Sequence, residues 1–275
     1  MDARRLTREM LDGFESNDLL TYASAIAFQI LTALVPLLLF LLGLAGWLDL
    51  GDIWRADLAP DVKASVSKPV YQVLEDTVNN VLGRKQLFWV TAGFALALWQ
   101  VSGAVRAVMG ALDGIYDSRY RRPAKVRYPV SLALAIAVGA LLVAAAAEVR
   151  FVPLLVDDQS TLVTVLLFVA RWAVAAALMA AVVALLIRFA PDRSRPLPWV
   201  TFGTLLVIVG WILMSIGFGL YLTYVASYGS VFGHLATLIV LMAYLYAAAA
   251  VFLGGLQLDA IVRREYNSRR RGAGS

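Results

Sequence analysis

The sequence predicts an all-α membrane protein, a polytopic bundle of six transmembrane helices with both termini in the cytoplasm. The first reason is composition: 61% of the 275 residues are hydrophobic and only 16% are charged, whereas soluble domains average about 45–50% apolar and about 25% charged residues. The second reason is that apolar runs recur, each near the roughly 20 residues needed to cross a bilayer. The third is that Lys and Arg gather in the connections between these runs.

The first 18 residues predict an amphipathic helix lying on the inner membrane surface. Leu6, Met10 and Phe14 recur at four-residue spacing with basic residues around them, a pattern typical of interfacial helices. From residue 19 to residue 262 we expect a single membrane domain. Its predicted spans are residues 19–48, 87–110, 129–148, 161–187, 200–225 and 234–261.

Two segments are expected outside these spans. Residues 51–86 place apolar side chains near helical spacing, and Pro60 and Pro69 are residues that start or break helices. We expect this segment to form a helical extracytoplasmic cap between spans 1 and 2; a solvated loop is the alternative. Residues 263–275 end in the letters RRRGAGS and are expected to be a basic, disordered tail.

The distribution of positive charge predicts the orientation. With the N-terminus inside, 16 Lys and Arg residues fall in the cytoplasmic segments and six in the outer ones, as the positive-inside rule requires. An even number of spans places both termini on the same side, which agrees with six. The net charge of +5 therefore reflects topology and attraction to anionic membrane lipids, and we expect no nucleic-acid partner.

Composition also excludes several chemistries. The chain has no Cys and a single His, so a disulfide, a thiolate nucleophile and a cysteine or multi-histidine metal site are all excluded. We see no nucleotide-binding motif. We therefore expect no catalytic residues, no metal, no cofactor and no enzymatic activity.

Three polar residues lie near mid-membrane depth in the predicted spans. Arg171 lies about ten residues, or roughly 15 Å, from the outer start of its span, while Gln29 and Gln100 lie at comparable depth. Buried polar groups at such depth mark functional sites by default, and a guanidinium suits a phosphate or carboxylate. We predict that these three residues form a substrate-binding site. The alternative is that Arg171 only bonds Gln side chains and backbone carbonyls.

Other polar residues lie near the ends of the spans. Arg106 is predicted to be an anchor at the inner membrane edge, where its side chain can reach lipid phosphates; the alternative is that it forms part of a site. Asp113 follows two helical turns later on the same face. His234 begins the last span on the outer side and favours a capping or interfacial role over a proton relay. Asp259 is expected to pair with Arg263, four residues further along.

Several stretches resemble the YihY/BrkB family of bacterial inner-membrane proteins, which was once labelled ribonuclease BN and includes the YhjD-type envelope proteins. The stretch at 23–42 contains Val35-Pro36-Leu37, the stretch at 98–122 begins LWQVSG, and the stretch at 228–260 ends GGLQLDA. Two positions depart from the family pattern. Asp113 stands where Asn is usual, so a role that needs an amide at this position does not transfer to this chain. Gln257 stands where Glu is usual, so a proton-carrying role at that position does not transfer either.

The resemblance implies a location in the bacterial plasma (inner) membrane and a role in envelope integrity. It does not imply a settled biochemical activity, because members are associated with serum resistance and, in one branch, with movement of lipopolysaccharide precursors. Ribonuclease activity is not expected, since metal-dependent hydrolysis needs a cluster of ligands that one His and no Cys do not supply.

Two functions from different classes remain open. The first is movement of an amphipathic, anionic or lipid-linked substrate without an ATPase of its own. The second is a non-transporting membrane scaffold for envelope machinery, for which envelope proteins or a second copy of the chain would be partners. A continuous polar groove favours movement, whereas apolar packing between Gln29, Gln100 and Arg171 favours the scaffold.

Overall fold

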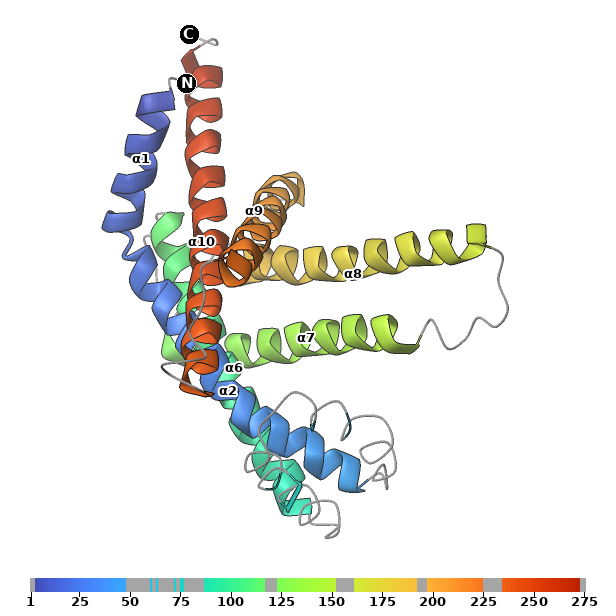
Figure 1. Ribbon diagram of the computed structural model, residues 1–275. Coiled ribbons are helices and arrows are strands. Elements are labelled where there is room, and N and C mark those ends of the chain that lie inside the picture. The colour runs from blue at the N-terminus through green and yellow to red at the C-terminus, as the bar shows by residue number, and fades with distance from the viewer. Residues whose placement is uncertain are drawn as a thin grey trace. The chain divides into compact units, whose positions relative to one another are not determined.

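The computed structural model describes residues 3–47, 60, 63, 72, 75–76, 87–116, 123–151, 161–191, 197–224 and 234–272. In this part of the chain the regular structure is entirely helical (Figure 1). The helices are α1 (Ala3–Ser16), α2 (Leu19–Trp47), α6 (Leu87–Ile115), α7 (Ala124–Phe151), α8 (Thr161–Phe189), α9 (Leu197–Tyr224) and α10 (His234–Gly272).

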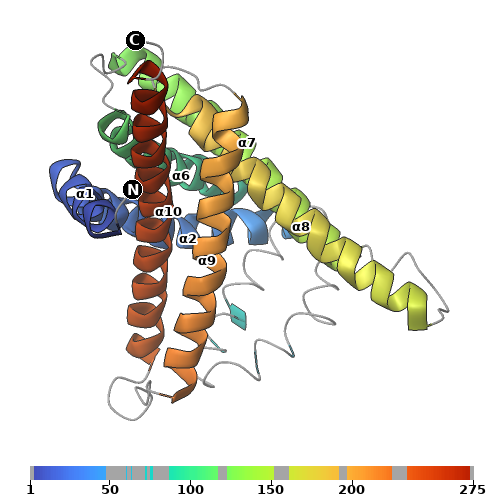
Figure 2. The same ribbon diagram turned by 90° about the horizontal axis from the view of Figure 1, so that it is seen from above.

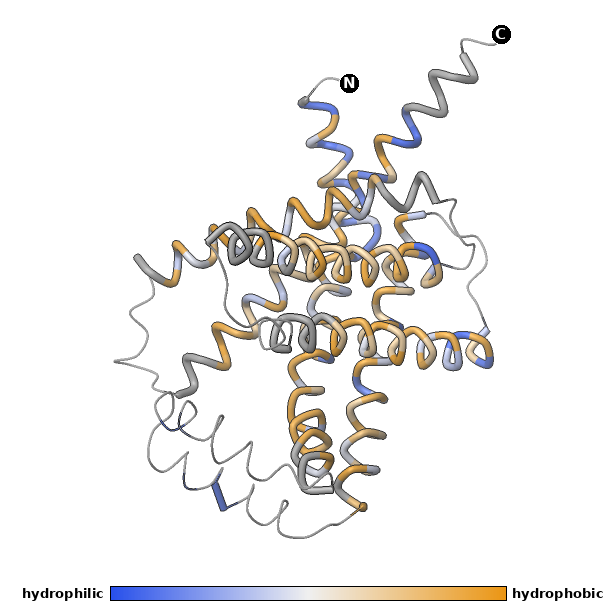
Figure 3. The backbone as a smooth tube through the Cα atoms, turned by 90° about the vertical axis from the view of Figure 1, so that its right-hand side faces the viewer, coloured by the Kyte–Doolittle hydropathy of each residue, from blue (hydrophilic) through white to orange (hydrophobic). Residues whose placement is uncertain are grey.

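Six of the described helices, α2 and α6 to α10, are long and apolar enough to cross a membrane. This confirms the predicted six-span helical bundle. The hydropathy of the chain follows the same division: the helices are mostly hydrophobic, and the hydrophilic stretches concentrate in α1 and near the end of α10 (Figure 3). Residues 51–86, the predicted cap, lie almost entirely outside the described residues, so the cap stays a prediction.

Helix α10 extends further than the sequence indicated. It continues to Gly272, through most of the segment that was expected to be a disordered tail. Arg and Glu are good helix formers, and residues 263–271 contain neither Gly nor Pro to stop the helix. Once α10 is nucleated inside the membrane, each added residue contributes one further hydrogen bond at little cost. Gly272, its last residue, is typical of a helix C-terminus.

The chain divides into two units, Met1–Leu31 with Ser102–Ser275, and Thr32–Val101. Helices α2 and α6 each contribute residues to both. In the second unit the two helices pack tightly: a Cβ placed on Gly93 would lie 2.6 Å from the Phe40 backbone nitrogen and 3.0 Å from the Pro36 carbonyl oxygen. The Phe40 ring lies 5.3 Å from that of Phe94. Helix α2 continues through Pro36 without a break.

In the first unit, α6 supplies much of the core. From Ser102 to Asp113 every residue is buried except Arg106 and Ala107, which are half-buried. Helices α7 and α8 pack side by side as an antiparallel pair, α8 packs on α9, and α9 packs on α10 (Figures 1 and 2). The outer faces of α7, α8 and α9 expose many large apolar side chains, as expected for helices in a hydrocarbon environment.

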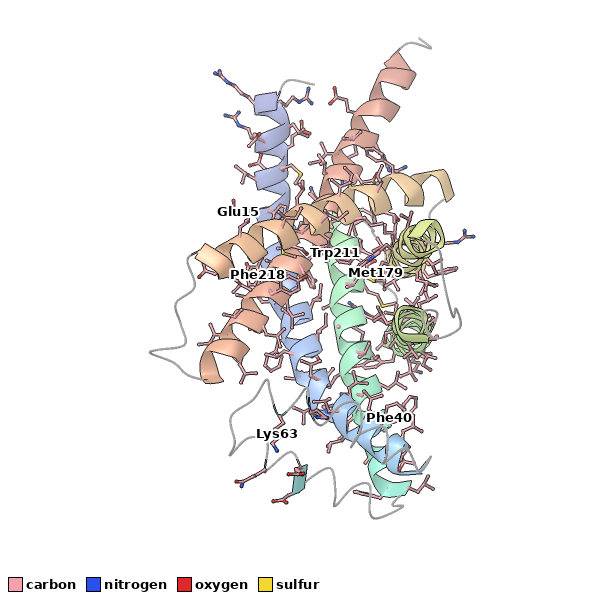
Figure 4. All side chains as sticks on the ribbon, turned by 45° about the vertical axis from the view of Figure 1, so that its right-hand side comes forward. Glu15, Phe40, Lys63, Met179, Trp211 and Phe218 are labelled. Carbon is pink, nitrogen blue, oxygen red and sulfur yellow. The ribbon has the colours of Figure 1, made fainter. Side chains whose placement is uncertain are left out.

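Aromatic contacts hold α9 against α10. The indole Nε1 of Trp211 donates a 2.8 Å hydrogen bond to the Ala248 carbonyl oxygen, and its ring stacks on Phe252 with centroids 6.1 Å apart. Further along α9, the Phe218 ring meets Tyr244 edge-on at 5.2 Å. Trp211 and Phe218 lie on α9 in Figure 4. These contacts anchor α9 at two levels along α10.

Helix α1 packs on α10 through small residues. A Cβ on Gly13 would overlap the Gln257 side chain, and one on Gly254 would lie 3.1 Å from the Phe14 ring. Its exposed side carries the pair Arg5–Glu9, whose 2.7 Å hydrogen bond raises the pKa of Arg5. The predicted helix in the first 18 residues is therefore present, and α10 covers part of its surface.

The chain turns sharply between α1 and α2. Asp18 adopts a left-handed conformation with φ of 50°, which Asp tolerates better than most residues. Its carbonyl oxygen accepts the Tyr22 amide at 3.1 Å, so the turn also supplies an acceptor for the first turn of α2.

Candidate functional site

The residues predicted to form a site at mid-membrane depth fall in different parts of the structure. Gln29 belongs to the first unit, Gln100 belongs to the second, and the side chain of Arg171 lies outside the described residues although its backbone is part of α8. The convergence of the three therefore stays a prediction. The side chain of His234, the first residue of α10, also lies outside the described residues.

Glycines on α6 let polar side chains of the first unit approach its backbone. Gly103, Gly110 and Gly114 face Gln29, Tyr22 and Asn17 respectively, and a Cβ at Gly103 would lie only 2.6 Å from the Gln29 Oε1. Small residues permit this close approach between membrane helices. Gln29 therefore packs against α6 at the level of Gly103.

A group of polar side chains joins α6 to α7. We call it the serine–arginine cluster, and it consists of Ser102, Arg106, Arg127, Tyr128 and Ser131. Arg106 Nη1 donates to the Ser102 Oγ at 2.6 Å and to the Ser131 Oγ at 3.4 Å, and the two hydroxyls lie 2.9 Å apart. Ser131 also donates to the Tyr128 carbonyl at 2.9 Å, so Ser102 is the donor in the Ser102–Ser131 bond.

The cluster holds two cations close together. Arg127 Nη2 donates a 2.7 Å hydrogen bond to the Arg106 carbonyl oxygen, while the Arg106 guanidinium lies 4.7 Å from the centre of the Tyr128 ring, a favourable cation–π distance. The sequence predicted Arg106 as an edge anchor. The structure adds that Arg106 bonds across to a second helix, a contact that the sequence did not reveal.

A buried ion pair lies further along the first unit. Asp259 on α10 is 2% exposed, and both of its carboxylate oxygens accept from the Nε of Arg263 at 2.7 Å. This confirms the predicted pairing. The Arg263 guanidinium lies 6.0 Å from the Phe202 ring centre, and Gly203 leaves room for the carboxylate beside α9. The pair therefore lies where α10 packs against the start of α9.

Two long-range contacts join α10 to segments far away in the sequence. Asn17 Nδ2 donates to the Gln257 Oε1 at 3.3 Å, and Gln257 is 4% exposed. Arg264 Nη2 donates at 3.0 Å to the carbonyl oxygen of Ile115, the last residue of α6, where a cation complements the helix dipole. Asp113, two residues earlier, is 7% exposed.

The described side chains offer cations and hydroxyls that can bind an anion. No group of three or more His, Cys, Asp or Glu residues within the described ranges could hold a metal ion. What they do provide is a pair of guanidinium groups supported by hydroxyls, which suits recognition of an anion. The sequence found Arg106, but Ser102, Ser131, Arg127 and Tyr128 carried no signal beyond being polar or aromatic residues near span ends.

Comparison with known proteins agrees with this architecture. The chain is 26% identical over 264 residues to the ribonuclease-like protein YfkH of Bacillus subtilis (strain 168), and the match covers 94% of each chain. No solved structure matches. The family described as virulence factor BrkB matches residues 10–275. With that match across nearly all of its length, this multi-pass membrane chain belongs to the BrkB family.

Proposed function

We propose that this protein binds an anionic, amphipathic lipid or lipid-linked molecule in the bacterial plasma membrane and lets it pass between leaflets without an ATPase of its own. We also propose that the protein is not an enzyme and, in particular, that it does not cleave RNA. The ribonuclease-like name belongs to YfkH, and a cleavage assay on labelled RNA with the purified chain is expected to give no products.

The observation that carries the proposal is the concentration of polar groups on α6. Over an 18-residue stretch of its candidate span, Val90–Ile115, 56% of the residues are buried, against 6–22% over stretches of the same length in the other five spans. Yet α6 carries Ser102, Arg106 and Asp113 within its buried stretch. Polar residues in the interior of a membrane bundle are costly and characteristically mark substrate or ion pathways.

The test is leaflet exchange in reconstituted liposomes. The full chain is inserted into vesicles that contain a phosphatidylglycerol with a fluorescent group on one acyl chain. An impermeant reductant then destroys the fluorescence of the labelled lipid in the outer leaflet. Protein-free vesicles lose about half of the signal, because only one leaflet is accessible. With the protein present, we expect the loss to approach completion.

Variants identify which polar residues take part. Ser102→Ala and Arg171→Ala are expected to slow exchange, because each removes a polar group from a span. The control is Val209→Ala, at an exposed apolar position of α9, which should exchange at the rate of the unmodified chain. Correctly folded protein that gives no exchange with any anionic lipid would contradict the proposal.

A scaffold role is the second candidate, and one observation favours it. Over an 18-residue stretch of its candidate span, α9 has only 6% of its residues buried. Its exposed face carries large apolar side chains that include Leu205, Ile212, Leu213 and Ile216. Such a face packs equally well against lipid or against another protein. Absence of exchange together with a defined oligomer in native-like membranes would favour the scaffold.

A further inference from the structure

We infer that the serine–arginine cluster is a binding site for the phosphate of an anionic membrane lipid, with an acyl chain of that lipid lying along the exposed face of α7. This inference deepens the proposed function by assigning the headgroup contact. The site itself does not depend on whether the bound lipid moves between leaflets.

The first support is the electrostatics of the cluster. Arg106 and Arg127 carry like charges that repel each other, yet a hydrogen bond from one side chain to the backbone of the other holds them together. The Nε of Arg127 is buried and has no hydrogen-bond acceptor. A phosphate near the outer nitrogens of Arg127 would offset the repulsion between the two guanidinium groups.

The second support is preorganisation. The Arg106 guanidinium is fixed from one side by the Ser102 and Ser131 hydroxyls and rests on the Tyr128 ring. Fixing a long side chain before a ligand arrives removes part of the entropic cost of binding. Arg127 also lies in the first turn of α7, where the helix dipole favours an anion.

The third support is the surface that continues from the cluster, and it identifies a lipid as the source of the phosphate. Tyr128, Leu132 and Ile136 follow one another at four-residue spacing on α7 and are 47%, 40% and 51% exposed. Beyond them, Gly139 faces open space, since apart from the adjacent backbone of its own helix no described atom lies within 4 Å of where its Cβ would be. An apolar stripe that starts at two cations suits an amphipathic anion and would add nothing to the binding of free phosphate.

The depth of the cluster agrees with a headgroup position. Arg127 is the fourth residue of the candidate span Ala124–Ala144, about 5 Å along the helix from its start. Basic residues at this level reach the phosphates of the adjacent leaflet. The acyl chain then runs into the hydrocarbon in the direction of the stripe.

The experiment measures lipid binding by the purified full chain in detergent. Short-chain phosphatidylglycerol is titrated, and bound lipid is counted by native mass spectrometry. The test variant is Arg127→Gln, and the matched control is Lys125→Gln, which removes the same charge from an exposed position two residues away. We expect Arg127→Gln to weaken binding roughly tenfold, as loss of a charge-assisted contact does, and Lys125→Gln to change it less than about twofold.

One further variant and two further ligands test whether Arg127 forms the site and whether its ligand is a lipid. Arg127→Lys keeps the charge but loses the planar fork, so we expect intermediate binding, and this variant replaces Arg127→Gln if the latter does not fold. Phosphatidylcholine should bind weakly, and inorganic phosphate should not displace phosphatidylglycerol. Equal binding by all variants overturns the site, and displacement by inorganic phosphate overturns the assignment to a lipid. Lipid binding that depends on Arg127 without leaflet exchange contradicts only the proposed movement.

Discussion

Asp259 is the most deeply buried acidic residue described in the first unit, and its environment determines how substitutions should act. Its side chain is 3% exposed, whereas that of Arg263 is 15% exposed. Removing the partner of a buried charge is more damaging than removing the charge itself, because the remaining ion has lost its compensation without regaining water.

We therefore predict an asymmetry between the two single variants. Arg263→Gln leaves the carboxylate buried and should cost about 3–5 kcal/mol of stability. Asp259→Asn leaves a partly exposed guanidinium and should cost only about 1–3 kcal/mol. The measurement is the unfolding free energy of each variant in mixed micelles with increasing denaturing detergent. Equal costs, or a larger cost for Asp259→Asn, would contradict the assigned burial of the pair.

Residue-level contacts also show where sequence reasoning succeeds. Asp259 and Arg263 are four residues apart on one helix, so helical periodicity alone predicted their pairing. Asn17 and Gln257 are 240 residues apart, and Arg264 and Ile115 are 149 apart. Such contacts depend on how whole helices pack, and no local pattern encodes them. The serine–arginine cluster was missed for the same reason.

At the scale of helices, the existence of each span was predictable because length and hydropathy are local properties. The ends were less so: α6 runs five residues past its predicted end, and α7 begins five residues before its predicted start. A helix can extend beyond its apolar run through charged residues such as Asp113 and Lys125, so hydropathy does not locate the helix boundary. Helix packing was not predictable, since it depends on where small residues face one another.

Gly93 provides the sharpest test of packing between two helices. A Cβ there would meet the Phe40 and Pro36 backbones, which cannot rotate away as a side chain can. We predict that Gly93→Ala destabilises the second unit by about 1–3 kcal/mol, the usual cost of overpacking.

Gly217 is the matched control, because it lies within α9 and, apart from the adjacent backbone of its own helix, has no described atom within 4 Å of its Cβ position. Gly217→Ala should be neutral or should stabilise the chain by about 0.5–1 kcal/mol through helix propensity. Thermal melting of both variants in the same detergent compares the two. If Gly93→Ala melted at or above the temperature of Gly217→Ala, the close packing of α2 and α6 would be wrong.

At the scale of the whole molecule, the orientation in the membrane is the property that the sequence predicts and the fold by itself does not decide. Sixteen of the 24 Lys and Arg residues fall on the side assigned to the cytoplasm. Because positive charges are retained on that side during insertion, we predict that both termini are cytoplasmic and that the segment 51–86 is outside.

The absence of Cys from the chain makes this topology directly measurable. Single variants Ser16→Cys, Ser65→Cys and Ser268→Cys are expressed in bacteria, and spheroplasts are treated with a membrane-impermeant maleimide before or after permeabilisation. We expect Ser65→Cys to react in intact spheroplasts, because it lies in the outer segment. Ser16→Cys and Ser268→Cys should react only after permeabilisation, with the unmodified chain as the blank.

Each departure from this pattern has a distinct physical meaning. Labelling of both terminal positions in intact spheroplasts would invert the topology and show that the charge asymmetry does not govern insertion. Labelling of only one terminal position would require an odd number of crossings, so one of the six apolar helices would not span the membrane. Arg106 lies near the end of α6 and Arg127 near the start of α7, and a hydrogen bond joins them. The expected labelling pattern would put these helix ends on the cytoplasmic side. The lipid-phosphate site would then lie in the cytoplasmic leaflet, where anionic lipids attract basic residues most strongly.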